Sequence, residues 1–110
     1  MHFMRWTVEI LNAAVASEIE ALPKDMGARL ARLIASIQEI GFEALPRDSV
    51  KHLEEKLWEL RVTGRDGISR AIYVTASGRR VVIVHAFVKK TQRTPGRELD
   101  IARQRAKEIT

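Results

Sequence analysis

Short apolar stretches, separated by turn-forming residues, fill the second half of the chain. Between residues 57 and 64, Trp58, Leu60 and Val62 alternate with Glu59 and Arg61. This alternation predicts a strand with one apolar and one charged face, because successive side chains of a strand point to opposite sides.

Two further strands are expected to follow as antiparallel hairpins. Gly64-Arg65-Asp66-Gly67 and Ser77-Gly78 are turn sequences, so strands over residues 68–75 and 79–88 complete a predicted three-stranded meander. Residues 81–88 are apolar on both faces, which is typical of a central strand covered on both sides.

The first half of the chain predicts a strand over residues 3–10 and two helices. The first helix begins at the N-cap Asn12 and stops at Pro23, and the second ends before Gly41, with apolar residues at helical spacing in both. We expect the two helices to form a hairpin, and residues 48–55 to make a helical turn. Thr94-Pro95 predicts the N-cap and first residue of an amphipathic C-terminal helix.

This order of elements indicates an α+β fold, in which an antiparallel sheet carries an N-terminal helical hairpin and a C-terminal helix. A chain of 110 residues is the size of a single domain, here 1–110. It has no cysteine and no apolar run near the roughly 20 residues that span a bilayer, so disulfides, thiolate catalysis and membrane insertion are not expected. We expect a cytoplasmic protein.

Charge is distributed unevenly along the sequence. Residues 61–110 contain 12 Lys and Arg against 4 Asp and Glu, whereas residues 1–60 contain 7 against 10. A basic surface of this kind favours a polyanionic partner, because each phosphate that is neutralised releases counterions. The alternative is a well-solvated basic domain without such a partner.

The predicted meander brings a set of cationic side chains and one tyrosine toward a single region of the sheet. The set comprises Arg61, Arg70, Tyr73, Lys89 and Lys90. Such groups suit metal-independent RNA cleavage by the ribose 2′-hydroxyl: a base removes its proton, cations stabilise the anionic phosphate, and an acid protonates the departing 5′-oxygen. Arg61 and Arg70 would supply forked donors, and Lys89 or Lys90 would be the base.

Each of these residues also has a structural interpretation. Arg61 can pair with Glu59 or Glu55, Arg70 can be a partly buried arginine satisfied by a carboxylate, and Tyr73 can be a packing residue. Within the apolar strand, His85 is interpreted as a hydrogen-bonded core histidine rather than a catalytic group. No His spacing predicts a zinc site, and we expect no metal and no cofactor.

One family shows the same arrangement. The runs Leu57–Arg61, Ser69–Tyr73 and His85–Pro95, followed by Glu98, Ala102 and Arg105, closely resemble the phage-derived HigB-like branch of the RelE/ParE toxin superfamily. The resemblance covers residues 53–109, whereas residues 1–52 match only in their order of strand and paired helices.

This resemblance implies a type II toxin that a helix-turn-helix, HigA-like antitoxin sequesters, and that contacts operator DNA only through the antitoxin complex. It further implies a ribosome-dependent endoribonuclease that cuts mRNA without a metal. The family's strand arginine falls on Arg70, its basic residues after the last strand on Lys89 and Lys90, and its ELR arginine on Arg61. The candidate RNA-binding residues are Arg61, Arg65, Arg93 and Arg97.

The sequence departs from the RelE pattern at its C-terminus. No aromatic residue or histidine follows Pro95, so Tyr73, His85 or a lysine is left as the general acid. Two alternatives to an mRNA interferase stay open: a non-enzymatic, ParE-like inhibitor of DNA gyrase, and an attenuated homologue that only binds the antitoxin.

Overall fold

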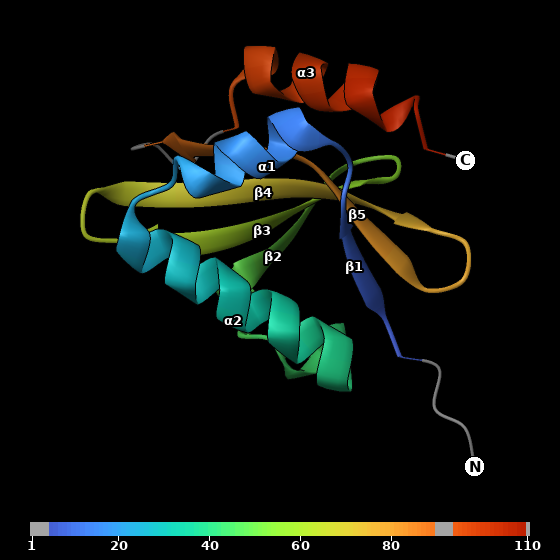
Figure 1. The fold of residues 1–110 in the computed structure, drawn as a ribbon, viewed down its shortest axis with the longest axis horizontal. Coiled ribbons are helices and arrows are strands. Elements are labelled where there is room, and N and C mark those ends of the chain that lie inside the picture. Colours follow the sequence, from blue (N-terminus) through green and yellow to red (C-terminus); the bar gives the residue numbers. More distant parts are fainter. Residues whose placement is uncertain (1–4, 90–93, 110) are drawn as a thin grey trace.

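The computed structural model describes residues 5–89 and 94–109, which form a sheet between helices (Figure 1). No helix in these two ranges is long and apolar enough to cross a membrane. The elements are β1 (Thr7–Ile10), α1 (Ala13–Glu20), α2 (Lys24–Ile40), the 3-10 turns η1 (Phe42–Ala44) and η2 (Arg47–Ser49), β2 (Val50–Glu54), β3 (Leu57–Gly64), β4 (Gly67–Ala76), β5 (Arg80–Lys89) and α3 (Gly96–Ala106).

The strands form one sheet in the order β1-β5-β4-β3-β2. The antiparallel pairing of β3, β4 and β5 confirms the predicted meander. In contrast, β1 runs parallel to β5, with Thr7 opposite Arg80 and Ile10 opposite Ile83. The sheet is therefore mixed, and the prediction of a purely antiparallel sheet is wrong. This pairing joins two segments far apart in the chain, which no local pattern connects.

The segment predicted as a helical turn over residues 48–55 is largely a strand. A short 3-10 turn covers Arg47–Ser49, and β2 then pairs antiparallel with β3, with Val50 opposite Leu60. Glu55 adopts a positive φ of 43° in the tight turn between the two strands. Cross-strand pairing thus outweighs the helical propensity of this charged segment, because intrinsic propensity is weak compared with tertiary contacts.

The helices cover opposite faces of the sheet. In Figure 1, α1 and α3 lie above the sheet and α2 lies below it. α1 packs along β5, whereas α2 packs on β3 and β1. The predicted helical hairpin is not confirmed, because its two helices contact different parts of the sheet.

α1 takes the place of a strand beside the second half of β5. β1 ends at Ile10, after which the Leu11 N–H donates to the Ile83 carbonyl at 3.1 Å. Further along β5, the Ala86 N–H donates to the Glu18 carboxylate at 3.1 Å instead of to a strand carbonyl. The side chain of Asn12 caps α1 by accepting from the Val15 N–H at 3.1 Å, as predicted.

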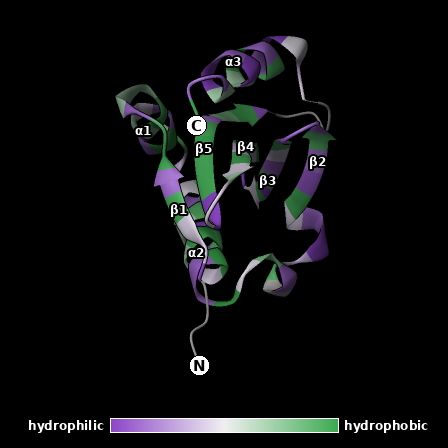
Figure 2. Ribbon diagram, turned by 90° about the vertical axis from the view of Figure 1, so that its right-hand side faces the viewer, coloured by the Kyte–Doolittle hydropathy of each residue, from purple (hydrophilic) through white to green (hydrophobic). Residues whose placement is uncertain are grey.

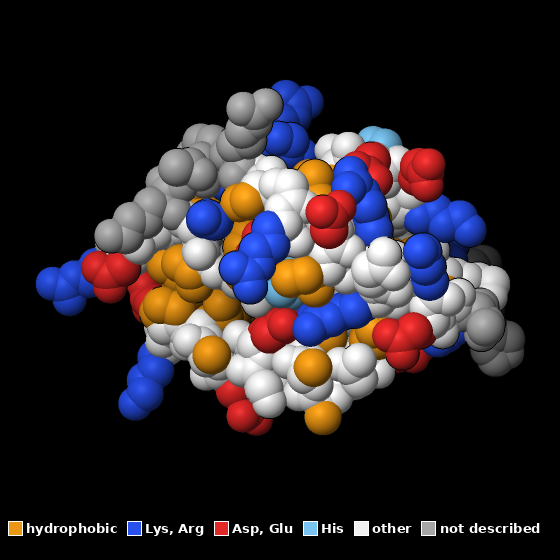
Figure 3. Space-filling view, turned by 90° about the horizontal axis from the view of Figure 1, so that it is seen from above, with side chains coloured by type: hydrophobic (Ala, Val, Ile, Leu, Met, Phe, Trp, Pro, Cys, Tyr) orange, Lys and Arg blue, Asp and Glu red, His pale blue; other side chains and the backbone are white. Residues whose placement is uncertain are grey.

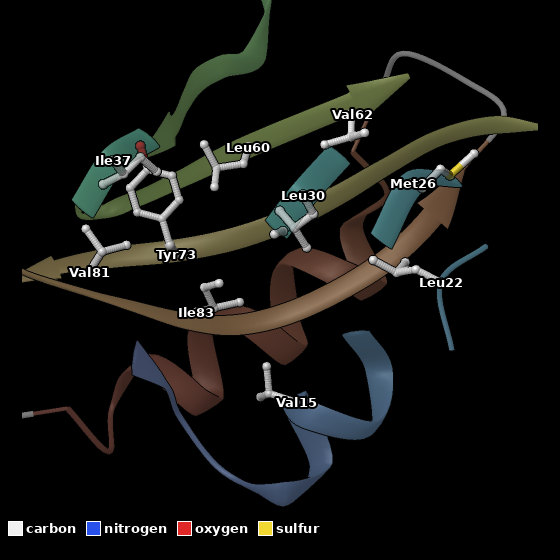
Figure 4. Packing of buried hydrophobic residues seen from close by; sticks show 11 residues of the cluster. Val15, Leu22, Met26, Leu30, Ile37, Leu60, Val62, Tyr73, Val81 and Ile83 are labelled. Carbon is white, nitrogen blue, oxygen red and sulfur yellow. The ribbon is translucent and has the colours of Figure 1, made fainter. Parts of the chain in front are cut away.

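Two apolar clusters hold these layers together. The larger lies between α2 and the sheet (Figure 4), and it includes Leu30, Ile37, Leu60 and Tyr73. The smaller lies beneath α3, around Ile72, Val82, Val84 and Ala102. Figure 2 shows β5 as mostly hydrophobic, and its residues 81–86 are buried, in agreement with the central strand predicted.

Gly64 permits the close contact between α2 and the end of β3. A Cβ atom at this position would lie 2.5 Å from the Met26 side chain, well inside van der Waals contact. A side chain here would therefore force apart the start of α2 and the β3–β4 turn.

Candidate functional site

Two arginines lie side by side on the face of the sheet that α3 covers, and they share one carboxylate. Arg61 on β3 stands directly opposite Arg70 on β4. The Arg61 Nε donates to Glu59 Oε1 at 2.7 Å, and the Arg70 Nη1 lies 3.4 Å from the same oxygen. Both arginines thus have the carboxylate partner that the structural interpretation of the sequence anticipated.

The residue before α3 completes this arrangement. The Thr94 hydroxyl donates to Glu59 Oε2 at 2.7 Å and accepts from Arg70 Nη1 at 2.9 Å. The prediction of Thr94 as N-cap is wrong: α3 begins at Gly96, with Pro95 in the cap position and no capping side-chain bond. We refer to Glu59, Arg61, Arg70 and Thr94 as the arginine–glutamate node. No sequence pattern assigned Thr94 to it.

The centre of the node is removed from solvent. Glu59 and Arg70 are 0% and 1% exposed, whereas 18% of the Arg61 side chain is accessible. Burial lowers the pKa of Arg70, the Glu59 carboxylate raises it, and the neighbouring Arg61 lowers it further, with a net decrease. In this conformation only Arg61 of the two arginines can reach a ligand directly.

The other predicted cations differ in their exposure and in their position relative to the node. Lys89 is half-buried, stands opposite Ile68 and shares the α3 face with Arg70. Arg65 is exposed in the β3–β4 turn, where its backbone N–H donates to the Asp25 carboxylate at 3.1 Å. Arg97 is exposed in the first turn of α3. Lys90 and Arg93 lie outside the described residues.

Tyr73 lies on the other face of β4, away from the cations. It is 2% exposed and stacks on Phe42, with ring centroids 5.4 Å apart. Burial raises the pKa of its hydroxyl. Arg70 and Tyr73 are three residues apart in a strand, and an odd separation places two side chains on opposite faces.

A second polar cluster connects β5 to both helices above it. His85, 4% exposed, places Nδ1 2.9 Å from Glu18 on α1 and Nε2 3.1 Å from Glu98 on α3. Arg105 donates to Glu18 and to the Val84 carbonyl, each at 2.9 Å. His85 is thus a hydrogen-bonded core histidine, as interpreted from sequence, whereas the part played by Glu18 was not anticipated.

Hydrogen bonds determine the charge state of Glu18. Partial burial raises the pKa of its carboxyl, but donation from Arg105, the Ala86 N–H and His85 outweighs this effect. The net pKa lies below its usual value of 4.5. The ionised carboxylate therefore ties α1 to β5 and α3.

The uneven charge of the sequence is partly balanced in space. On the face seen in Figure 3, acidic and basic side chains alternate over the helices. Basic residues from the second half of the chain pair with acidic residues from the first half, so these cations do not form a uniformly basic surface. The pairs include Arg80 with Glu9, Arg103 with Glu54, and Arg105 with Glu18.

Within residues 5–89 and 94–109, no three His, Asp or Glu side chains gather closely enough to hold a metal ion. The chemistry that the node can provide is electrostatic. A partly exposed guanidinium, held in place by a buried carboxylate, can donate two parallel hydrogen bonds to a phosphate.

Solved structures define the class of fold. The chain is similar to a mutant of the Escherichia coli toxin RelE in the free state, with a TM-score of 0.61, 10% identity, and coverage of 97% of this chain and 100% of that one. It is also similar to a chain of the RelBE2 toxin–antitoxin complex from Mycobacterium tuberculosis, with a TM-score of 0.55, 15% identity, and coverage of 82% and 98%. This protein therefore has a RelE-like α+β fold.

The family follows from the sequence itself. Residues 17–107 match the phage-derived protein Gp49-like family (DUF891), and the chain belongs to this family. No curated protein matches the chain significantly.

Proposed function

We propose that the chain is the toxin of a type II toxin–antitoxin system, in the HigB-like branch, and that it blocks translation by cutting mRNA on the ribosome without a metal. A helix-turn-helix, HigA-like antitoxin would neutralise it and connect it to operator DNA. Gp49-like family membership and the RelE-like fold support this proposal. The observation that carries it is the pairing of Arg61 with Arg70 around Glu59, on the face that also holds Lys89.

In this proposal Arg61 and Lys89 contact the RNA. Lys89 takes the proton of a ribose 2′-hydroxyl, whose oxygen then bonds to the adjacent phosphorus while the bond to the 5′-oxygen breaks. Arg61 donates to the non-bridging oxygens as their charge increases, and such electrostatic stabilisation is usually the largest single contribution to catalysis. Lys90, outside the described residues, is the candidate donor of a proton to the leaving 5′-oxygen.

Arg70 acts as a positioning residue in this proposal, because its side chain is fully buried. Its guanidinium neutralises Glu59, and Glu59 in turn orients Arg61. Tyr73 has no part in the proposed chemistry, since its hydroxyl lies on the face that α2 covers.

The test is to express the chain in bacteria without its antitoxin and to map new 5′ ends on translated mRNAs by primer extension. We expect cuts within translated codons. Replacing Arg61 or Lys89 by Ala should lower their yield about a hundredfold at matched protein levels, because each removes a donor or a proton acceptor from the reacting phosphate. Lys56→Ala, in the exposed β2–β3 turn, is the matched control and should leave the cuts unchanged.

The positioning role of Arg70 has its own comparison. Arg70→Lys retains a positive charge beside Glu59 and should preserve more cleavage per folded molecule than Arg70→Ala. Equal cleavage by both variants would contradict that role. Growth arrest without mRNA cuts would contradict the interferase and favour a non-enzymatic inhibitor, whereas a folded chain that arrests nothing would favour an antitoxin-binding homologue.

A further inference from the structure

A groove follows the part of β3 that extends beyond the end of β2. The pairing of β2 with β3 begins with Val50 opposite Leu60, so on this side β3 has no strand partner at Arg61 and beyond. Two hollows of about 300 and 380 Å³ lie here, and both are lined by Asp48, Arg61 and Thr63. The shared residues place both hollows against the open edge of β3, and we call the two together the β3-edge groove.

The β3-edge groove is strongly cationic. Among the described residues that line it, Asp48 is the only acidic one. Its cations come from four elements, α2, η2, β2 and β3: Arg29, Arg32, Arg47, Lys51 and Arg61.

The charges of this groove are not balanced like those beneath α3. In the described parts of the chain, no ion pair involves Arg32, Arg47 or Lys51, and all three side chains are exposed. Three cations of the groove therefore face solvent beside one lining carboxylate, Asp48. Such an arrangement attracts a polyanion, and arginine in particular matches the geometry of phosphate oxygens.

The open edge itself favours a phosphate backbone over an added peptide strand. The Arg29 guanidinium donates to the Thr63 carbonyl, and thereby occupies an acceptor that an incoming strand would use. A phosphate chain needs no backbone pairing, and the charged heads of Arg32, Arg47 and Lys51 can contact it without displacing that bond.

We propose that the β3-edge groove binds the phosphodiester backbone of single-stranded RNA and leads it to Arg61, the residue that the groove shares with the arginine–glutamate node. This inference depends on the proposed function, which identifies RNA as the polyanion. It adds a binding surface that extends from Arg61 to residues outside the proposed chemistry, and it assigns a role to Arg32, Arg47 and Lys51.

The test measures binding of a fluorescent single-stranded 2′-O-methyl RNA by anisotropy over a range of salt concentrations. This RNA lacks the free 2′-hydroxyl and cannot be cut, so binding is scored apart from cleavage. Arg32→Glu with Arg47→Glu should weaken binding at least tenfold and reduce the salt slope by about 1.4, since each single-strand phosphate contact contributes about 0.7. Lys56→Glu with Lys107→Glu makes the same change in net charge at exposed positions outside the groove, and should have a much smaller effect.

Both double variants alter exposed side chains, and thermal unfolding tests whether each is folded. If the groove variant does not fold, Lys51→Glu alone provides the same comparison with Lys56→Glu. Equal losses in the groove and control variants would overturn the proposal, because net charge alone would explain binding. Normal RNA binding by the groove variant, with lost binding of a poly-glutamate peptide, would overturn it in favour of an acidic protein partner.

The two proposals fail separately. If the chain cuts mRNA in cells but the groove variant binds RNA as well as its control does, the proposed role of the groove is wrong and the proposed function stands. Groove-dependent binding by a chain that makes no cuts would overturn the endoribonuclease and leave the binding site.

Discussion

The face of the sheet beneath α2 buries apolar side chains and Tyr73, whereas the face beneath α3 buries Glu59, Arg70 and His85 among its apolar residues. Both faces belong to the same strands and both are covered by a helix. They differ because neighbouring residues of a strand point to opposite faces, so that each face receives every second residue.

This difference separates stability from chemistry. Each large apolar side chain buried beneath α2 contributes roughly 1.5–3 kcal/mol. A buried ion pair such as Arg70–Glu59 contributes little net stability, because the desolvation of both charges offsets their attraction. What the pair provides is geometry: it holds a carboxylate where Arg61 can be oriented toward the edge of the sheet.

The largest effect on stability is expected from removing one partner of the Arg70–Glu59 ion pair. Glu59→Ala leaves Arg70 buried without its carboxylate and should lower the free energy of unfolding by about 4 kcal/mol, as for other buried ion pairs that lose one partner. Urea denaturation at neutral pH measures this change.

A double variant distinguishes the pair from simple packing. Glu59→Leu with Arg70→Met replaces the buried ion pair by apolar side chains like those beneath α2. The free energy of unfolding of this double variant should lie within about 1 kcal/mol of that of the natural chain. A double variant as unstable as Glu59→Ala would show that shape, and not uncompensated charge, causes the loss.

A smaller loss is expected on the apolar face. Leu30 is 2% exposed beneath α2, and Leu30→Ala should cost about 3 kcal/mol in the same denaturation experiment, through lost burial and the cavity that remains. Leu30→Met conserves volume and should cost less than about 1.5 kcal/mol. Equal costs for the two would mean that the cavity is not the cause. Neither variant should alter mRNA cutting per folded molecule.

Local sequence patterns predicted the strands of the meander but not the pairings at the two edges of the sheet. Alternation and turn residues predicted β3, β4 and β5, and the apolar run over residues 81–88 predicted that β5 is covered on both faces. The β2 strand was missed, because its charged sequence forms a strand only when paired with β3. The parallel β1–β5 pair was missed for the same reason, since it joins segments that lie far apart in the chain.

The candidate site was predicted in part. The predicted meander placed Arg61 and Arg70 in one region of the sheet, and each was given a carboxylate partner as its structural interpretation. The structure identifies Glu59 as the partner of both. The alternation of side chains along β4 separates Tyr73 from Arg70, although the predicted meander had grouped the two in one region of the sheet. Thr94 could not have been assigned, because its hydroxyl reaches Glu59 only through the tertiary position of the segment before α3.

The smallest effect concerns the polar cluster around His85, and it depends on pH. Glu18 has a lowered pKa in the folded chain, so its contribution is fully present above the unfolded value of 4.5 and is lost as the pH falls through the folded value. Glu18→Gln should therefore destabilise the chain by about 1 kcal/mol at pH 7, since it weakens charge-assisted bonds to Arg105 and His85. The difference from the natural chain should shrink as the pH is lowered from 5 to 3. Thermal unfolding over this range measures it, with Glu20→Gln, an exposed position on the same helix, as the matched control. A difference that stayed constant down to pH 3 would mean that Glu18 stabilises the α3 face by packing, as the residues beneath α2 do, and not by its charge.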